Sequence, residues 1–140
     1  MREELRPVRF QLELLKPEML LEEAGIASTM VIYGSARIPE PEKADALVAA
    51  ASDARSLEIA ERLKAKSRYY EEARKLAQIA STCGIYDEDG HRHFVVCSGG
   101  GPSIMEAANR GAEDVGMDSI GLNIVLPHEQ APNRFVTPAL

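Results

Sequence analysis

Three consecutive glycines, at positions 99–101, stand between a run of β-forming residues and a run of helix-forming residues. A further glycine, Gly34, ends a second β-forming run and is followed by Ser35. Because glycine has no Cβ atom, it adopts positive φ and lets a phosphate, a ribose or a base approach the main chain. Main-chain N–H groups at a helix N-terminus also attract anions. These turns predict a nucleotide site, with turns that are simply tight as the alternative.

Side chains near these turns are candidate ligand contacts. Ser35 could bond a ligand or close its own turn, and Arg37 could reach a phosphate or stay a solvated loop cation. Met105 could wall a pocket or fill a gap in the core, and Asn109 lies one helical turn beyond Glu106 on a similar face. A carboxylate at Glu106 would also favour the helix dipole by about 0.3–1 kcal/mol with no function at all. The predicted substrate-binding residues are Gly34, Ser35, Arg37, Gly99, Gly100, Gly101, Ser103, Met105, Glu106 and Asn109.

The segments around the glycines have the patterns of strands and helices. Strands are predicted at 29–33, 94–97 and 119–126, where β-branched and other apolar residues run together. Helix is predicted over 42–81, in two pieces, and over 103–115, with Pro and Gly suited to its two ends. Alternating strands and helices are typical of a parallel sheet wound with helices, whose ligands gather at the carboxyl ends of the strands.

A separate helix is predicted ahead of the first strand. Residues 11–24 carry leucine and methionine at helical spacing, with Pro17 as an interruption and Gly25 as a stop. We therefore divide the chain into an N-terminal helical arm, residues 1–28, and a nucleotide-binding part, residues 29–140.

Composition excludes several classes of protein. A chain of 140 residues with 45% apolar content is enough for one core. It has no apolar run near the ~20 residues that cross a bilayer, and its N-terminus lacks the order of a secretory signal, so we expect a cytoplasmic protein without a membrane partner. A net charge of -6 argues against a nucleic-acid partner, which would require a basic face.

The cysteines and two of the histidines suggest no metal site. Cys83 and Cys97 have neither a CxxC partner nor a nearby histidine at ligand spacing, so we expect no zinc and no disulfide. Both are predicted to be buried as small apolar residues. His91 and His93 flank an arginine in a turn and are predicted to be exposed to solvent.

Standard phosphate-binding motifs do not fit the glycine run. A GxGxxG fingerprint begun at Gly99 would need glycine where Ile104 stands, and the same residue excludes a P-loop. A nucleophile elbow at Ser98 would need glycine at Val96. The glycines therefore indicate a less common nucleotide-binding fold.

Three segments carry a family resemblance: GSAR at 34–37, CSGGGPSIMEAANRGA at 97–112 and SIGLNIVLPHEQAPN at 119–133. They closely resemble the LONELY GUY family, whose members are often labelled lysine decarboxylase-like. Within the third segment, His128 and Glu129 are predicted to form a lid over the site, with an exposed loop pair as the alternative.

The resemblance implies a fold and an activity. In that family a Rossmann-like subunit dimerises and hydrolyses the N-glycosidic bond of nucleoside 5'-monophosphates, which releases a free base and ribose 5-phosphate without a metal or redox cofactor. The implied fold class is α/β: a Rossmann-like parallel sheet wound with helices, incomplete at about three strands, plus the helical arm. The implied partners are a nucleoside 5'-monophosphate and further copies of the chain, as a homodimer or a higher homo-oligomer.

The match to the family is partial. Ser103 stands where the family usually has a glycine, and Gly34-Ser35-Ala36 replaces its usual Gly-Ser-Ser. The family's Arg-Lys segment and PGGxGTxxE motif, which grip the phosphate and supply the catalytic Arg and Glu, would follow Leu140. We therefore expect a truncated or processed part of a longer protein that carries part of the site, with catalytic residues unassigned.

Three hypotheses follow from these observations. The first is a nucleotide nucleosidase, whose oxocarbenium-like transition state needs a carboxylate near the sugar and a positive phosphate anchor. The second is a non-catalytic nucleotide- or cofactor-binding module, because related Rossmann-like proteins with similar glycine loops bind molybdenum cofactor or nucleic acid. The third is a structural fragment that contributes only a dimer face.

Overall fold

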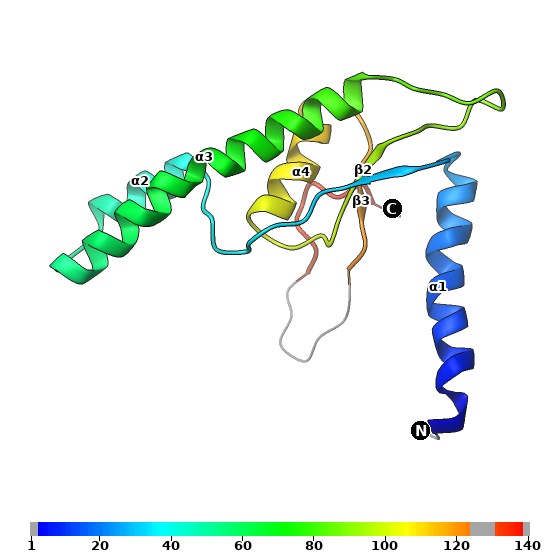
Figure 1. Ribbon diagram of the computed structural model, residues 1–140, viewed down its shortest axis with the longest axis horizontal. Coiled ribbons are helices and arrows are strands. Elements are labelled where there is room, and N and C mark those ends of the chain that lie inside the picture. Colours follow the sequence, from blue (N-terminus) through cyan, green and yellow to red (C-terminus); the bar gives the residue numbers. More distant parts are fainter. Residues whose placement is uncertain (1–2, 124–130, 139–140) are drawn as a thin grey trace.

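A computed structural model of the chain describes residues 3–123 and 131–138. Its elements, in chain order, are η1 (Glu3–Leu5), α1 (Arg6–Glu23), β1 (Thr29–Val31), α2 (Pro41–Ala49), α3 (Ala54–Thr82), β2 (Val95–Ser98), α4 (Ile104–Glu113) and β3 (Ile120–Gly121). Figure 1 shows the long helix α3 crossing beside α4, the strands next to α4, and α1 standing away from this body.

The described strands form one parallel sheet in the order β1-β2-β3. Thr29 pairs with Val95 and Val31 pairs with Cys97, whose other neighbour across the sheet is Ile120. The carboxyl ends of the strands therefore lie at one edge of the sheet. The α/β class, with about three parallel strands wound by helices, is confirmed.

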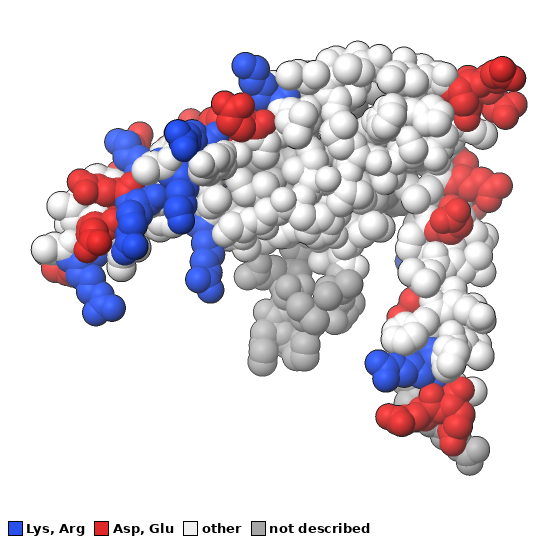
Figure 2. All heavy atoms as spheres, viewed as in Figure 1, with Lys and Arg blue, Asp and Glu red and all other residues white. Residues whose placement is uncertain are grey.

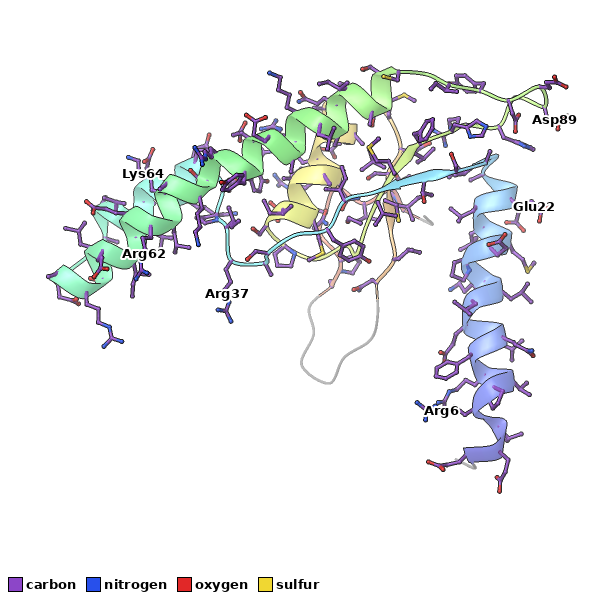
Figure 3. All side chains as sticks on the ribbon, in the orientation of Figure 1. Arg6, Glu22, Arg37, Arg62, Lys64 and Asp89 are labelled. Carbon is purple, nitrogen blue, oxygen red and sulfur yellow. The ribbon has the colours of Figure 1, made fainter. Side chains whose placement is uncertain are left out.

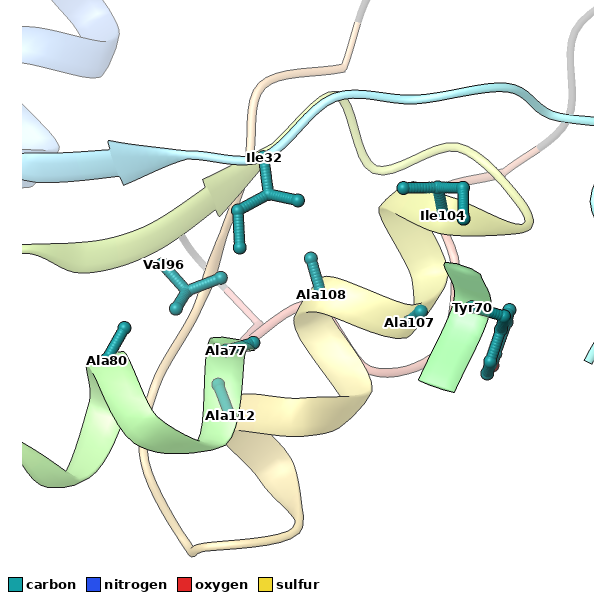
Figure 4. Close-up of a cluster of buried hydrophobic side chains, with 9 residues drawn as sticks. All are labelled: Ile32, Tyr70, Ala77, Ala80, Val96, Ile104, Ala107, Ala108 and Ala112. Atoms are coloured by element: carbon teal, nitrogen blue, oxygen red, sulfur yellow. The ribbon is translucent and has the colours of Figure 1, made fainter. Parts of the chain in front are cut away.

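The main core lies between the sheet and helices α3 and α4 (Figure 4). Alanine dominates this core, and its small side chain lets the helices approach the strands and each other closely. The buried members are Ile32, Tyr70, Ala77, Ala80, Val96, Ile104, Ala107, Ala108 and Ala112. A smaller cluster is formed by Val95, Cys97 and Ile120, against which Leu21 and Ile26 pack.

Gly111 allows α4 to lie against α3. A Cβ atom at this position would collide with the carbonyl oxygen of Arg74 and would lie 2.8 Å from the Cβ of Ala77. Three residues further on, Asp114 accepts hydrogen bonds from the Arg74 guanidinium, with Nη2 at 2.8 Å, and from Gln78. The hydrogen bonds from Arg74 lower the pKa of Asp114, so the carboxylate stays charged and ties the two helices together.

The N-terminal helix is longer than its sequence pattern predicts. We predicted helix from residue 11, but α1 starts at Arg6 and continues through Pro17. Pro17 lacks the N–H that a helical residue would donate, but no residue of α1 is buried, so water can satisfy the carbonyl left without a partner. Gly25, with a φ of 62°, follows the helix end as predicted.

The predicted limits of the other helices agree more closely with the structure. Helix over 42–81 does divide into two pieces, α2 and α3. Asp53 caps the second piece, because its carboxylate accepts the N–H groups of Arg55 and Ser56 in the first turn of α3. Gly116, with a φ of 71°, follows α4 as predicted. Of the strand predicted at 119–126, Ile120–Gly121 is the paired part among the described residues, and residues 124–126 lie outside the described part.

Two exposure predictions are wrong. Cys83 is exposed, because it caps the carboxyl end of α3 where the chain leaves the helix, whereas Cys97 is buried as predicted. His93 is half-buried rather than exposed, because its Nδ1 lies 3.0 Å from the Ser28 hydroxyl. His91 is exposed as predicted.

Charges are mixed on the face shown in Figure 2, where basic and acidic side chains alternate over α2 and the first part of α3. One pair there joins Lys64 to Asp45, with Nζ 2.7 Å from Oδ1. Both side chains are more than half exposed, so the pair adds little stability. Among the described helices, none has the length and apolar character needed to cross a membrane.

The contact at Gly111 generates a stability prediction. Gly111→Ala should lower the free energy of unfolding by about 1–3 kcal/mol, because the added methyl group meets the α3 main chain and the helices must move apart. Glu113→Ala, an exposed change in the same helix, is the control and should cost no more than about 0.5 kcal/mol. Urea denaturation followed by circular dichroism measures both, and equal stability of the two variants would contradict this account of the helix packing.

Candidate functional site

The loop after β2 and the turn after β1 both line a hollow of about 490 Å³ beside the end of β3. Its volume falls within the range of small-molecule sites. The lining residues are Tyr33, Ala36, Gly99, Gly100, Gly101, Pro102, Met105, Leu122, Asn123 and Ala131. The fold thus brings residues of both glycine turns to one place at the carboxyl edge of the sheet.

The predicted substrate-binding residues divide into two groups. Gly99, Gly100, Gly101 and Met105 line the hollow. The others do not line it, and they are Gly34, Ser35, Arg37, Ser103, Glu106 and Asn109.

Three of the predicted glycines leave room for neighbouring side chains. A Cβ atom on Gly34 would collide with Ile104, and one on Gly101 would lie 2.6 Å from Cε of Met105. A Cβ atom on Gly99 would lie 3.0 Å from the Tyr33 ring and 3.1 Å from the Met105 sulfur. Packing against Ile104 therefore explains the absence of a side chain at Gly34, whereas a side chain at Gly99 or Gly101 would require the neighbouring Met105 or Tyr33 side chain to move.

Gly100 is the member of the glycine run that has positive φ, at 69°. Its N–H donates to the hydroxyl of Ser98 at 3.0 Å, and its carbonyl accepts the N–H of Asn133 at 2.7 Å. An added Cβ atom would lie 3.4 Å from the Cβ of Pro132. Both main-chain polar groups of Gly100 are thus already used by the protein, and the loop is held in one conformation.

Asn109 is fully buried, and its amide is the centre of the network that holds the loop. Its Oδ1 accepts from the Ser98 hydroxyl at 2.7 Å and from Nδ2 of Asn133 at 3.0 Å. Its Nδ2 donates to the Ser119 hydroxyl at 3.0 Å and to the Ile120 carbonyl at 3.2 Å. The amide therefore has protein partners on both of its polar atoms, so its structural role is to position the ends of two strands and the glycine loop.

Glu106 faces helix α3. Its Oε1 accepts the Tyr70 hydroxyl at 3.1 Å, and Arg110 lies between Tyr70 and Glu40, with its Nη1 2.8 Å from the Glu40 carboxylate. Burial raises the pKa of Tyr70 to about 12, so its hydroxyl stays protonated and can donate. This polar network joins α4 to α3 and to the start of α2.

The turn after β1 is exposed. The Ser35 hydroxyl accepts the N–H of Arg37 at 3.1 Å, so in this structure Ser35 closes its own turn. The Arg37 side chain extends from the loop, away from α2 and α3 (Figure 3).

Ser103 has an unusual main-chain conformation for a residue with a side chain, with φ of 66° and ψ of -119°. Glycine adopts this region freely, whereas other residues pay about 1–3 kcal/mol. The Ser103 hydroxyl also donates to the carbonyl of Ile38, which ties the start of α4 to the segment after β1.

Sequence reasoning missed several residues at the site. Tyr33 and Leu122 line the hollow, and Asn133 bonds the carbonyls of both Gly100 and Gly101. Tyr33 directly precedes the first glycine turn, so its position at the end of a predicted strand could have marked it as a candidate ligand contact. Asn133 ends the segment 119–133 that carries the family resemblance, but its contact with the loop could not be predicted, because that contact depends on the return of a distant segment.

Candidate metal ligands lie elsewhere. Within residues 3–123 and 131–138, one group of acid and histidine side chains is compact enough to share a cation: Asp87, Asp89 and His91. Asp87 Oδ1 already accepts the N–H groups of Asp89 and His91, at 3.0 and 2.8 Å, which is the arrangement of an ordinary tight turn. The predicted lid residues His128 and Glu129 lie outside the described residues.

No protein-family model matches this chain, and no curated protein matches it either. The fold defines its class, an α/β protein with a three-stranded parallel sheet wound by helices and an N-terminal helix.

The buried amide generates a pH-dependent prediction. In Asn109→Asp, an oxygen replaces the nitrogen that donates to the Ile120 carbonyl, so the introduced carboxyl is stable there only when it is protonated. Its pKa in the folded state is then raised above the unfolded value of about 3.9. The variant should lose stability relative to the parent as pH rises above that value, by about 1.4 kcal/mol per pH unit until the folded pKa is passed.

Urea denaturation of parent and variant at pH 4.5 and pH 7 measures this effect. Asn123→Asp, at an exposed position, is the matched control and should show nearly the same difference from the parent at both pH values. An Asn109→Asp penalty that does not change with pH would show that this amide is not enclosed as described.

Proposed function

We propose that this chain is a LONELY GUY-type nucleotide-binding part of an enzyme that hydrolyses the N-glycosidic bond of nucleoside 5'-monophosphates. The products would be a free base and ribose 5-phosphate. The proposal includes assembly into a homodimer or a larger homo-oligomer, as the resemblance implies, and it places the substrate in the hollow beside the glycine loop.

The observation that carries the proposal is the position of the glycine loop. Residues 99–101 connect β2 to α4 at the carboxyl edge of a parallel sheet, where ligands of such folds bind. The turn after β1 lines the same hollow through Ala36.

The conformation of Ser103 supports the resemblance. Its φ of 66° is one that glycine favours, and the resembled family usually has glycine at this position. The main chain thus follows a path suited to the family's glycine, although this sequence has serine there.

The lining of the hollow also supports a second candidate function. No charged side chain is among its described lining residues, whereas hydrolysis needs a carboxylate near the sugar and a positive anchor for phosphate. A binding module without hydrolysis needs no carboxylate at the sugar. The two candidates differ in whether charged groups from outside this hollow complete the site.

Nucleotide binding is tested at Gly100. Gly100→Val should weaken AMP binding by at least about tenfold, or ~1.4 kcal/mol, because the side chain would resist a φ of 69° and narrow the hollow. Gly116→Val is the matched control, since Gly116 has a φ of 71° and open space around it. Titration calorimetry should show that the control keeps the parent affinity, and equal AMP affinity of the parent and Gly100→Val would refute the assignment of the site.

Catalysis is tested by product analysis. The 140-residue chain alone should release little or no adenine from AMP, because each absent transition-state charge partner costs about 10²–10³ in rate. A longer form that carries the PGGxGTxxE motif should release adenine readily. Chromatography of both reactions decides between them: robust turnover by the short chain would mean that its own carboxylates catalyse, and binding without turnover by both forms would favour the second candidate.

A further inference from the structure

The hollow beside the glycine loop has the lining of a site for an uncharged ring. Its side chains include an aromatic ring, a thioether and an aliphatic group, from Tyr33, Met105 and Leu122, with Asn123 as a polar side chain. Tyr33 is 60% exposed although it lies at the end of a buried sheet, so its ring is accessible to a ligand.

A phosphate group would be poorly placed in this hollow. A phosphate dianion that leaves water needs cationic or N–H partners, and an unpaired buried charge is costly. The described lining has no Lys, Arg or His, and the N–H of Gly100 already donates to Ser98. An uncharged part of the nucleotide therefore suits the side chains of this lining better than its phosphate does.

The side chains of Tyr33 and Met105 both lie close to Gly99. Measured from the position that a Cβ atom of Gly99 would occupy, the Tyr33 ring lies at 3.0 Å, its hydroxyl at 3.3 Å and the Met105 sulfur at 3.1 Å. The missing side chain of Gly99 thus leaves room for the Tyr33 ring and the Met105 sulfur beside the same point of the main chain, and both side chains line the hollow. Such side chains stack well on the faces of planar heterocycles.

We infer that this hollow holds the base of the nucleotide, stacked on Tyr33, and that the phosphate stays outside it. Tyr33 is then a residue that recognises the base. This inference rests on the proposed function, because it assigns one part of the proposed substrate to one part of the proposed site.

Titration calorimetry with AMP, adenosine and ribose 5-phosphate tests the inference. Tyr33→Ala should weaken binding of AMP and of adenosine by the same factor, on the order of 10- to 100-fold, because base stacking on an aromatic side chain is lost. Tyr33→Phe keeps the ring and should stay within about threefold of the parent. Ribose 5-phosphate, which has no base, should bind parent and Tyr33→Ala alike.

The control is Tyr86→Ala, which removes an aromatic ring that is 54% exposed and does not line this hollow. It should leave AMP affinity unchanged, and circular dichroism should show native helix content in every variant. AMP affinity that Tyr33→Ala does not change would overturn the inference alone. A loss of ribose 5-phosphate affinity in Tyr33→Ala would place the phosphate in the hollow and also overturn it, whereas a parent chain that binds no AMP would overturn the proposed function together with this inference.

Discussion

The buried amide of Asn109 joins segments that are far apart in the sequence and that together form the candidate site. Through Ser98 it holds the end of β2 and the N–H of Gly100, and through the Ile120 carbonyl it holds β3. Through Asn133 it holds the segment that returns to cover the glycine loop. A buried amide must satisfy both its donor and its acceptor, and here its partners Ser98, Ile120 and Asn133 each lie within two residues of a residue that lines the hollow. The shape of the hollow therefore depends on one residue that does not line it.

Glycine has a different role at this site from the one that its sequence pattern first indicates. A glycine-rich turn at a strand end is commonly understood as room for a ligand. Here Ile104, Met105 and Tyr33 occupy the space beside Gly34, Gly101 and Gly99. The glycines let these side chains lie close against the main chain, and two of the side chains then form the surface that faces the hollow. A ligand in the hollow would contact those side chains as well as the main chain of the three glycines.

Local patterns predicted the elements well, and contacts between distant segments explain what they missed. The strands before the two glycine turns, the division of 42–81 and the helix stops at Gly25 and Gly116 were readable, because each depends on residues within a few positions. The candidate site was only partly readable. The glycine loop and Met105 were found, but the enclosure of Asn109 and the approach of Asn133 require knowing how the sheet and the returning segment pack. The extension of α1 through Pro17 was missed for another reason, since an exposed helix tolerates proline where a buried one would not.

An uncharged hollow limits what this part of the site can contribute to hydrolysis. A neutral stacking contact with Tyr33 would strengthen little in the transition state, because glycosidic cleavage develops positive charge on the sugar and leaves the bonding electron pair on the departing base, and an uncharged wall stabilises neither charge strongly. Binding of that kind lowers KM without raising kcat. Under the proposed function, rate acceleration would then require charged or proton-donating groups at the sugar, the leaving base and the phosphate, from outside the described lining. The part of the protein described here would select and orient the nucleotide, and the charged groups that act on it would have to be brought to the rim of the hollow.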